Sequence, residues 1–345
     1  MATLLRAFTL PRRLAATALA CVIGVSIASA QAAEKIDLTM GVIVAPGDLY
    51  SRLTASVPER IAKATNGRVS VTVSDSLVAP AQIASSVRDG RLPMSAALHT
   101  YLAAEEPRMG IFNLPGLINN IDDYVTVRKA FWGDDVAKIW ADKWNAKDLA
   151  EGAWCTTRLF SKEPIHSLAD FKNKRLRVHN PQTAALMQAL GAKPTPLPVS
   201  ELMPALERGV IDGVFTSACV GNAMELWRVA PNVQDWGLSP ITGWAILMSE
   251  NTWKSLPKDV QGQIEGAMQE LQKEAFGNHT QAVNAALKEM EGHGAKMWSA
   301  NAEQRAALAD PKLNQPAYES WYARAKEVGF DGKAYIAKVR AALGR

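Results

Sequence analysis

The stretch that decides the fold is residues 172–217, KNKRLRVHNPQTAALMQALGAKPTPLPVSELMPALERGVIDGVFTS. Residues 175–179 alternate basic and apolar side chains, a pattern that is typical of a β-strand. In such a strand Leu176 and Val178 lie on one face, and Arg177 lies on the other. We therefore expect a strand to hold the Arg177 side chain in a fixed position.

The rest of this stretch predicts further helices and strands. Residues 181–190 suit a helix, because they begin with a proline, carry apolar side chains at helical spacing and are followed by a glycine. A second short helix then leads into residues 210–215, whose apolar side chains predict a buried strand. Ligands of open α/β sheets bind at the carboxyl ends of the strands. We therefore expect a binding site at Arg177, Thr216 and Ser217.

A family resemblance rests on residues 190–213, LGAKPTPLPVSELMPALERGVIDG, which follow the strand that carries Arg177. This combination resembles the signature of the extracytoplasmic solute receptors of tripartite ATP-independent periplasmic (TRAP) transporters. The resemblance implies an α/β, periplasmic-binding-protein-like fold, with two lobes joined by hinge strands and braced by a long helix. It also implies that the lobes close on a small organic acid, that Arg177 clamps the carboxylate and that Thr216 takes a polar contact position. The partners that it implies are the acid and the membrane permease subunits of a TRAP transporter.

Each predicted lobe is built from two segments of the chain. Lobe I takes residues 31–154 and 243–282, and lobe II takes residues 155–242 and 283–345. Apolar side chains recur at helical spacing over residues 258–290, which predicts one long helix spanning both lobes. The chain has 345 residues, 48% of them hydrophobic, which is enough for two cores.

Further strands are predicted from runs of alternating or continuous apolar residues, namely residues 36–44, 69–73, 94–98, 152–160 and 242–249. The first three runs alternate with helical patterns, which favours a mostly parallel sheet with right-handed crossovers. The run at 242–249 is expected to return to lobe I. The tail that contains Trp298 is predicted to be helical and to pack against a lobe.

Residues 1–30 have the three parts of a secretory signal peptide. Basic residues at positions 6, 12 and 13 precede an apolar run, which ends in the small residues of a cleavage site. We therefore expect an exported, periplasmic protein; a membrane anchor or a twin-arginine route is the alternative. Removal of the three arginines lowers the formal net charge from +4 to +1, so nucleic-acid binding is not expected.

Two cysteines, Cys155 and Cys219, remain after the signal peptide, since Cys21 lies within it. In an oxidising compartment they are able to form a disulfide, and two buried free thiols are the alternative. The sequence leaves this choice open, because the distance between the two residues decides it.

Arg177 is the central candidate for ligand binding. A guanidinium stays charged and presents paired donors that match both oxygens of a carboxylate, which a lysine does not reproduce. The ordinary interpretation of an arginine on a strand is a surface salt bridge, here with Asp170. The surrounding motif favours the binding site.

Other candidate ligand contacts lie at strand ends or near the expected hinge. Arg158 lies close to where relatives carry a second ligand-facing arginine, although a one-residue shift in a strand turns a side chain to the other face. His99 and Tyr101 follow the run 94–98 and are expected to supply hydrogen bonds from lobe I. Thr216 and Ser217 complete the polar set from lobe II.

Three tryptophans, Trp154, Trp227 and Trp244, flank the segments between the lobes. Core packing is the ordinary fate of a tryptophan. With little additional charge nearby, the three rings favour a monocarboxylate with an aromatic or apolar body, and Trp154 and Trp244 are the candidate ligand contacts. A four-carbon dicarboxylate, or another oxo or hydroxy acid, is the alternative ligand.

No catalytic motif is present in the sequence, and the histidines are scattered without the spacing of metal ligands. Of the histidines, only His179 lies near Arg177. We therefore expect no catalytic residue, no metal and no cofactor, and a monomeric binding protein. A periplasmic enzyme or a sensor-linked receptor on a similar fold is the alternative.

Overall fold

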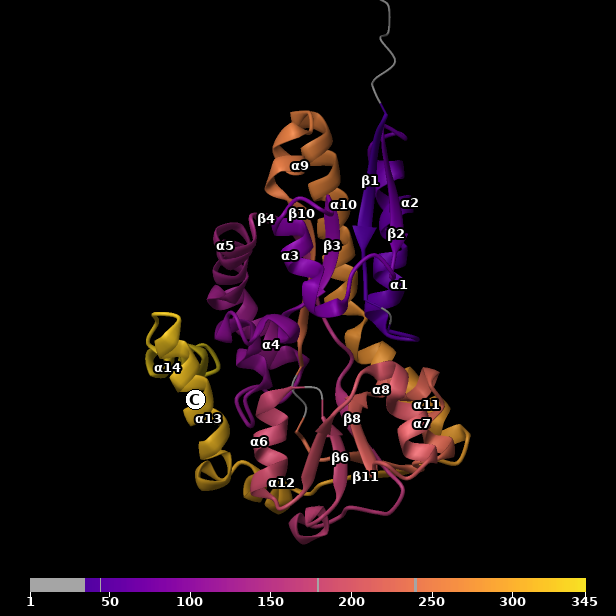
Figure 1. The fold of residues 1–345 in the computed structure, drawn as a ribbon, viewed down its shortest axis with the longest axis vertical. Helices are drawn as coiled ribbons and strands as arrows, with labels where there is room; N and C mark the ends of the chain where they lie inside the picture. Colours follow the sequence, from indigo (N-terminus) through magenta and orange to yellow (C-terminus); the bar gives the residue numbers. More distant parts are fainter. Residues whose placement is uncertain (1–34, 44, 179, 239–240) are drawn as a thin grey trace, which may run out of the picture. The chain divides into compact units, whose positions relative to one another are not determined.

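The computed structural model describes residues 35–43, 45–178, 180–238 and 241–345. The predicted signal peptide, residues 1–30, and His179 lie outside the described residues. Residues 35–345 form one unit. It contains two β-sheets with helices packed on both, as Figure 1 shows. The predicted α/β fold is confirmed, and the exact boundaries of the two lobes stay a prediction.

Lobe I is the first sheet, in the order β2-β1-β3-β10-β4, with the helices packed on it. Its strands are β1 (Ile36–Gly41), β2 (Val69–Ser74), β3 (Met94–Leu98), β4 (Ala146–Ala153) and β10 (Gly243–Ser249). β1 pairs in parallel with β2 and β3, whereas β10 runs antiparallel between β3 and β4. The helices are α1 (Leu49–Ala55), α2 (Val57–Ala64), α3 (Ile83–Arg88), α4 (Ile121–Val127), α5 (Gly133–Trp144), α9 (Glu250–Ser255) and α10 (Lys258–Gly277). A π-helical segment, Arg128–Trp132, joins α4 to α5.

Lobe II is the second sheet, in the order β11-β9-β5-β8-β6-β7, with its own helices. Its strands are β5 (Thr157–Ser161), β6 (Arg175–Val178), β7 (Lys193–Pro196), β8 (Gly213–Ser217), β9 (Asn232–Asp235) and β11 (Lys296–Ser299). The helices are α6 (Pro181–Ala189), α7 (Leu202–Glu207), α8 (Ala218–Ala223), α11 (His279–Gly292) and α12 (Ala302–Leu308). β7 carries two prolines and lies at the edge of the sheet, where a missing N–H is tolerated.

Short 3-10 turns and two tail helices complete the described chain. The turns are Pro80–Gln82, His99–Leu102, Pro107–Asn113, Leu168–Phe171, Val199–Glu201 and Leu226–Arg228. The tail helix α13 (Pro311–Glu327) contacts both α6 of lobe II and the turn Pro107–Asn113 of lobe I. The last helix, α14 (Gly332–Ala342), packs on α4.

The central stretch folds largely as its sequence predicts. β6 carries Arg177, α6 begins at Pro181, and β6 pairs in parallel with both β7 and β8. The predicted strand over 210–215 is shifted, since β8 begins at Gly213 and includes Thr216 and Ser217.

Three predicted elements are wrong in detail. The run 152–160 is not one strand, because β4 ends at Ala153 in the first sheet and β5 begins at Thr157 in the second. The helix predicted over 258–290 breaks at Asn278 into α10 and α11. Gly277 and Asn278 both have low helix propensity, which favours a break at this point. Trp298 lies in β11 and not in a helix.

The two halves of the broken helix pack on different lobes. α10 lies against β4 and α2 of lobe I, and α11 lies against α8 of lobe II (Figure 1). The first residue of α11, His279, is tied to the segment between the sheets, because its Nε2 atom lies 3.0 Å from the carbonyl oxygen of Trp154.

Large aromatic side chains fill the core of lobe I. Trp132, Trp140, Trp144 and Trp244 are among the largest fully buried side chains. Gly152 makes room for the ring of Trp244, since a Cβ atom at position 152 would lie 2.1 Å from Cζ2 of that ring. Trp244 is therefore a core residue of the first sheet.

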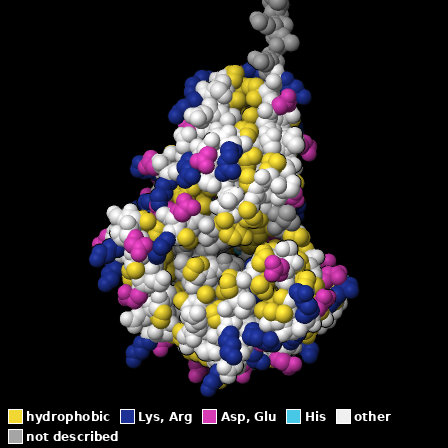
Figure 2. Space-filling view, in the orientation of Figure 1, with side chains coloured by type: hydrophobic (Ala, Val, Ile, Leu, Met, Phe, Trp, Pro, Cys, Tyr) yellow, Lys and Arg dark blue, Asp and Glu magenta, His cyan; other side chains and the backbone are white. Residues whose placement is uncertain are grey.

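On the face shown in Figure 2, acidic and basic side chains are interspersed over the surface. Among the residues that the structure describes, no helix combines the length and the apolar character that a membrane span requires.

Candidate ligand-binding site

A small cavity of about 50 Å³ lies where the two lobes meet at Arg177. Its polar lining residues are Thr100, Tyr101, Thr157, Thr216, Ser217 and Thr242. Its apolar lining residues are Leu98, Trp154, Val199 and Val220. Arg177 is the one charged residue among the described residues that line it. The cavity therefore combines a single cation with hydroxyl groups and apolar walls.

The Arg177 side chain is buried and held by backbone carbonyl groups. It is 5% exposed, its Nε donates to the carbonyl oxygen of Leu197 at 2.9 Å, and its Nη1 donates to that of Phe215 at 2.9 Å. Burial lowers the pKa of Arg177 to about 10, and Tyr101 opposes this shift. Since this pKa lies well above 7, the guanidinium is charged at neutral pH.

Arg177 does not form the surface salt bridge that is its ordinary interpretation. Asp170 instead accepts hydrogen bonds from the backbone N–H groups of His166 and Ser167. Within the described part of the chain, no carboxylate forms an ion pair with Arg177, and Tyr101 is the one titratable partner that shifts its pKa.

Five of the predicted site residues come together at this cavity, namely Tyr101, Trp154, Arg177, Thr216 and Ser217. Tyr101 is 40% exposed, whereas Thr216 and Ser217 are buried at the end of β8.

Arg158 does not line this cavity. It forms an ion pair of 3.2 Å with Asp235 and lines a separate cavity with that residue and Lys288. Its neighbour Thr157 lines the cavity at Arg177 instead. The sequence left open which way the Arg158 side chain faces. In the structure it faces away from this cavity, and Thr157, one residue earlier, faces it.

His99 and Trp244 also lie outside the cavity lining. Both are fully buried in lobe I, and the His99 ring contacts the rings of Trp132 and Trp140. Burial lowers the pKa of His99 to about 3, so this histidine is neutral at physiological pH. Trp227, the third tryptophan of the ring argument, stacks on His293 and is not a lining residue.

Sequence reasoning missed several lining residues. Thr100, Thr157 and Thr242 contribute hydroxyl groups, and Leu98, Val199 and Val220 contribute apolar side chains. Leu98 ends β3, Thr157 begins β5 and Thr242 directly precedes β10. A position at a strand end is the one signal that the sequence gives for these three residues. Many residues that do not line the cavity have the same signal, so it does not identify them.

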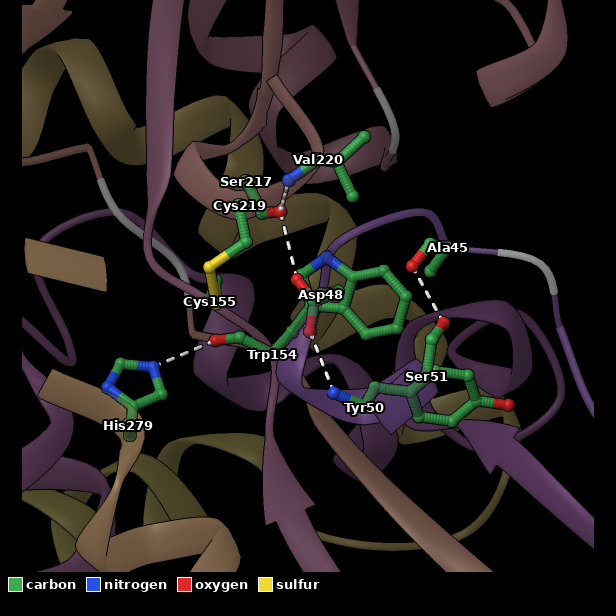
Figure 3. The surroundings of a disulfide bond; sticks show 10 residues. All are labelled: Ala45, Asp48, Tyr50, Ser51, Trp154, Cys155, Ser217, Cys219, Val220 and His279. Carbon is green, nitrogen blue, oxygen red and sulfur yellow. Dashed lines mark hydrogen bonds between the residues drawn. A yellow bond between two sulfur atoms is a disulfide. The ribbon is translucent and has the colours of Figure 1, made fainter. Parts of the chain in front are cut away.

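A buried hydrogen bond connects the lobes beside the cavity (Figure 3). Asp48 caps α1 in lobe I, and Ser217 caps α8 in lobe II. The Ser217 hydroxyl donates to Oδ2 of Asp48 at 3.0 Å and accepts from the N–H of Val220 at 3.1 Å. A hydroxyl has one proton to donate. Because that proton goes to Asp48, Ser217 has no proton left to donate to a ligand.

Burial has the largest effect on the pKa of Asp48. The residue is 1% exposed, and burial raises its pKa to about 6. Hydrogen bonds from the Tyr50 N–H, the Ser217 hydroxyl and the Cys155 N–H oppose this shift. The carboxylate is therefore held by lobe I, by lobe II and by the segment between the two sheets.

Cys155 and Cys219 form a disulfide, which settles the choice that the sequence leaves open (Figure 3). It ties the segment between β4 and β5 to α8. Among the described residues, the group of three side chains with the spacing of metal ligands is Asp48, Cys155 and Cys219. Since the two sulfur atoms are bonded to each other, they do not offer thiolates to a metal.

A larger cavity of about 390 Å³ is lined by Asp48, by residues at the start of α1 and by residues of α8 and α11. Arg52 and Glu289 both line it, and Glu289 accepts a hydrogen bond of 2.7 Å from Asn222. Because both acidic and basic side chains line this cavity, its charge does not favour the binding of an anion. The smaller cavity at Arg177 is the better candidate on chemical grounds.

Comparison with known proteins identifies the family. Residues 40–325 match the model of the DctP family, described as bacterial extracellular solute-binding protein, family 7. A solute-binding protein of Roseobacter denitrificans is 25% identical over 264 residues, which are 75% of this chain and 79% of that protein. The C4-dicarboxylate-binding periplasmic protein DctP of Rhodobacter capsulatus is 27% identical over 285 residues, which are 80% and 84% of the two chains.

A solved structure has the same fold. The Bordetella pertussis protein DctP7, described as an extracytoplasmic solute receptor binding pyroglutamic acid, superposes with a TM-score of 0.79 at 19% identity. The match covers 88% of this chain and 99% of that one. Together with the family match, this likeness confirms the resemblance inferred from residues 190–213. The chain belongs to the bacterial extracellular solute-binding proteins of family 7, the DctP family of TRAP solute receptors.

Proposed function

We propose that this protein captures a small organic acid with a single carboxylate in the cavity at Arg177. In this proposal a monomeric receptor in the periplasm closes its lobes on the acid and delivers it to the membrane permease subunits of a TRAP transporter. The family match supports the role of receptor, and the site described above supports the choice of ligand.

The observation that carries the proposal is the buried Arg177 guanidinium, which has no acidic partner in the described part of the chain. A buried charge without an ion-pair partner is costly, and an anion that enters the cavity removes this cost. The backbone carbonyls of Leu197 and Phe215 fix the plane of the guanidinium. A fixed guanidinium favours two parallel hydrogen bonds to a carboxylate.

The lining supports a monocarboxylate with an apolar or aromatic body. Leu98, Val199 and Val220 supply apolar walls. Of the three tryptophans near the hinge, Trp154 is the one that lines the cavity. Arg158, the cation that would pair with a second carboxylate, is already engaged with Asp235. The small volume favours a compact acid, and a larger ring would require the lobes to move apart.

A four-carbon dicarboxylate, or an oxo or hydroxy acid, is the alternative ligand. The name of the Rhodobacter capsulatus relative favours a dicarboxylate, and the engagement of Arg158 argues against it. An enzymatic role is the other alternative. Recovery of the bound acid unchanged after prolonged incubation would speak for binding without catalysis.

A thermal-shift panel tests the choice of ligand directly. The purified protein is heated with monocarboxylates that have branched, cyclic or aromatic bodies, and with succinate and malate at the same concentration. We expect the monocarboxylates to raise the melting temperature more than the dicarboxylates, because one guanidinium serves one carboxylate. Stabilisation by the dicarboxylates alone would overturn the monocarboxylate assignment.

A further inference from the structure

Two threonine hydroxyls in the cavity wall have no hydrogen-bond partner among the described residues. They belong to Thr100 and Thr242, which are 9% and 5% exposed and which both line the cavity at Arg177. A buried hydroxyl without a partner is destabilising, so such groups in folded proteins are rare and need a specific explanation. The cavity beside them is where a partner from solution can reach them.

The sheet brings these two residues together. β3 and β10 are antiparallel neighbours, with Leu98 opposite Trp244 and Ala97 opposite Ala245. Thr100 lies in the 3-10 turn His99–Leu102 that directly follows β3, and Thr242 directly precedes β10. Each therefore leaves the same edge of the first sheet, next to the cavity. Rotation about χ1 exchanges the hydroxyl and the methyl group of a threonine, so each residue is able to turn its oxygen towards a ligand.

The two threonines and Arg177 belong to different lobes. Arg177 lies on β6 of the second sheet, whereas Thr100 and Thr242 adjoin strands of the first. One lobe thus contributes a cation, and the other contributes two neutral groups that both donate and accept hydrogen bonds. Apolar side chains, including Trp154 and Val220, complete the lining.

We propose that Thr100 and Thr242 recognise a neutral hydrogen-bonding group of the ligand, while Arg177 holds its carboxylate. The inference rests on the proposed function, whose single carboxylate at Arg177 it keeps. Of the ligands weighed there, it selects a compact monocarboxylate that carries a hydroxyl, an oxo group or a lactam amide over one with a purely apolar body. A second carboxylate does not fit this pair, because no cation accompanies Thr100 and Thr242 in the cavity lining of the described residues. A plain alkanoate leaves both hydroxyls unpaired.

Matched pairs of acids test the inference by calorimetry. Pyroglutamate is compared with cyclopentanecarboxylate, which has a ring of the same size without the amide, and lactate is compared with propionate. In the wild-type protein we expect the polar member of at least one pair to bind about tenfold or more tightly, which corresponds to about 1.4 kcal/mol.

The variant that carries both Thr100→Val and Thr242→Val removes the hydroxyls and keeps the branched shape. In this variant we expect the preference within the pair to fall close to onefold, because the polar member loses its hydrogen bonds to the two hydroxyls. Because neither hydroxyl has a partner in the described structure, the melting temperature should not fall. Thr72→Val on the exposed face of β2 is the control, and it should retain the wild-type preference.

The outcomes separate this inference from the function on which it rests. If acids bind through Arg177 but the double variant keeps the wild-type preference, the role of the threonines is overturned and the carboxylate receptor stands. If the wild-type protein binds the apolar member of every pair as tightly as the polar one, the inference is likewise overturned. If no acid of the panel binds, the proposed function fails, and the inference fails with it.

Discussion

The hydroxyl of Ser217 donates a hydrogen bond of 3.0 Å to the carboxylate of Asp48, across 169 residues of sequence and from one lobe to the other. Each residue also caps the start of a helix: Asp48 caps α1, and Ser217 caps α8. Both side chains are almost fully buried. The bond therefore couples the starts of two helices, one from each lobe, beside the cavity at Arg177.

Replacement of Ser217 by alanine should destabilise the protein more than the loss of an ordinary helix cap. Ser249→Ala is the matched control. The Ser249 hydroxyl caps α9 by accepting a bond of 3.1 Å from the N–H of Thr252, and it donates within lobe I to the neutral hydroxyl of Thr252. We expect a loss of about 1 kcal/mol for Ser249→Ala and about 2 to 3 kcal/mol for Ser217→Ala, which also leaves a buried carboxylate without one donor. Urea unfolding measures both values, and equal losses would contradict an energetic role for the Asp48 bond.

Asp48 should make the stability of the protein depend on pH. Burial raises its pKa from 3.8 to about 6, so between these values the folded protein binds more protons than the unfolded chain. The stabilisation present below the lower value is therefore lost as the pH rises through 6, and the loss amounts to about 3 kcal/mol.

The variant Asp48→Asn removes this ionisation. Relative to the wild type, the free energy of unfolding of the variant should therefore rise by about 2 kcal/mol between pH 4 and pH 7. Asp331→Asn, at the exposed cap of α14, is the control and should not show this gain. Denaturant unfolding at several pH values measures the difference, and a constant difference across the range would refute the assignment.

The disulfide should contribute substantially to stability. It joins Cys155 and Cys219, which are 64 residues apart, and thereby restricts the unfolded chain. Replacement of both cysteines by alanine should lower the free energy of unfolding by about 2 to 4 kcal/mol. A reducing agent should destabilise the wild type in the same way and leave the double variant unaffected. Insensitivity of the wild type to full reduction would show that the crosslink contributes little.

The elements with local signals were predictable from the sequence. β6, α6 and the position of Arg177 on its strand follow from alternation, from Pro181 and from Gly191. The break between β4 and β5 was not predictable, because the run from Gly152 to Phe160 stays strand-like while the chain passes from one sheet to the other.

The candidate site was predictable only in part, because burial and long-range contacts decide it. Trp154 and Trp244 both lie near the hinge in the sequence. The ring of Trp244 is nevertheless in the core, because Gly152 on the neighbouring strand has no side chain and leaves room for it. Arg158 has the same chemistry as Arg177, but Asp235, far along the chain, engages it. The hydrogen bond of Asp48 was not predictable from the sequence, since its partner Ser217 lies in the other lobe.

The affinity of Arg177→Ala for the strongest ligand of the thermal-shift panel, measured by calorimetry, tests the central claim most directly. Arg175→Ala is the control, because Arg175 lies on the same strand but is exposed and paired with Asp212. We predict that Arg177→Ala lowers the affinity about 100-fold or more, which corresponds to about 2.7 kcal/mol, while Arg175→Ala retains it. Near-native affinity of Arg177→Ala would contradict the account.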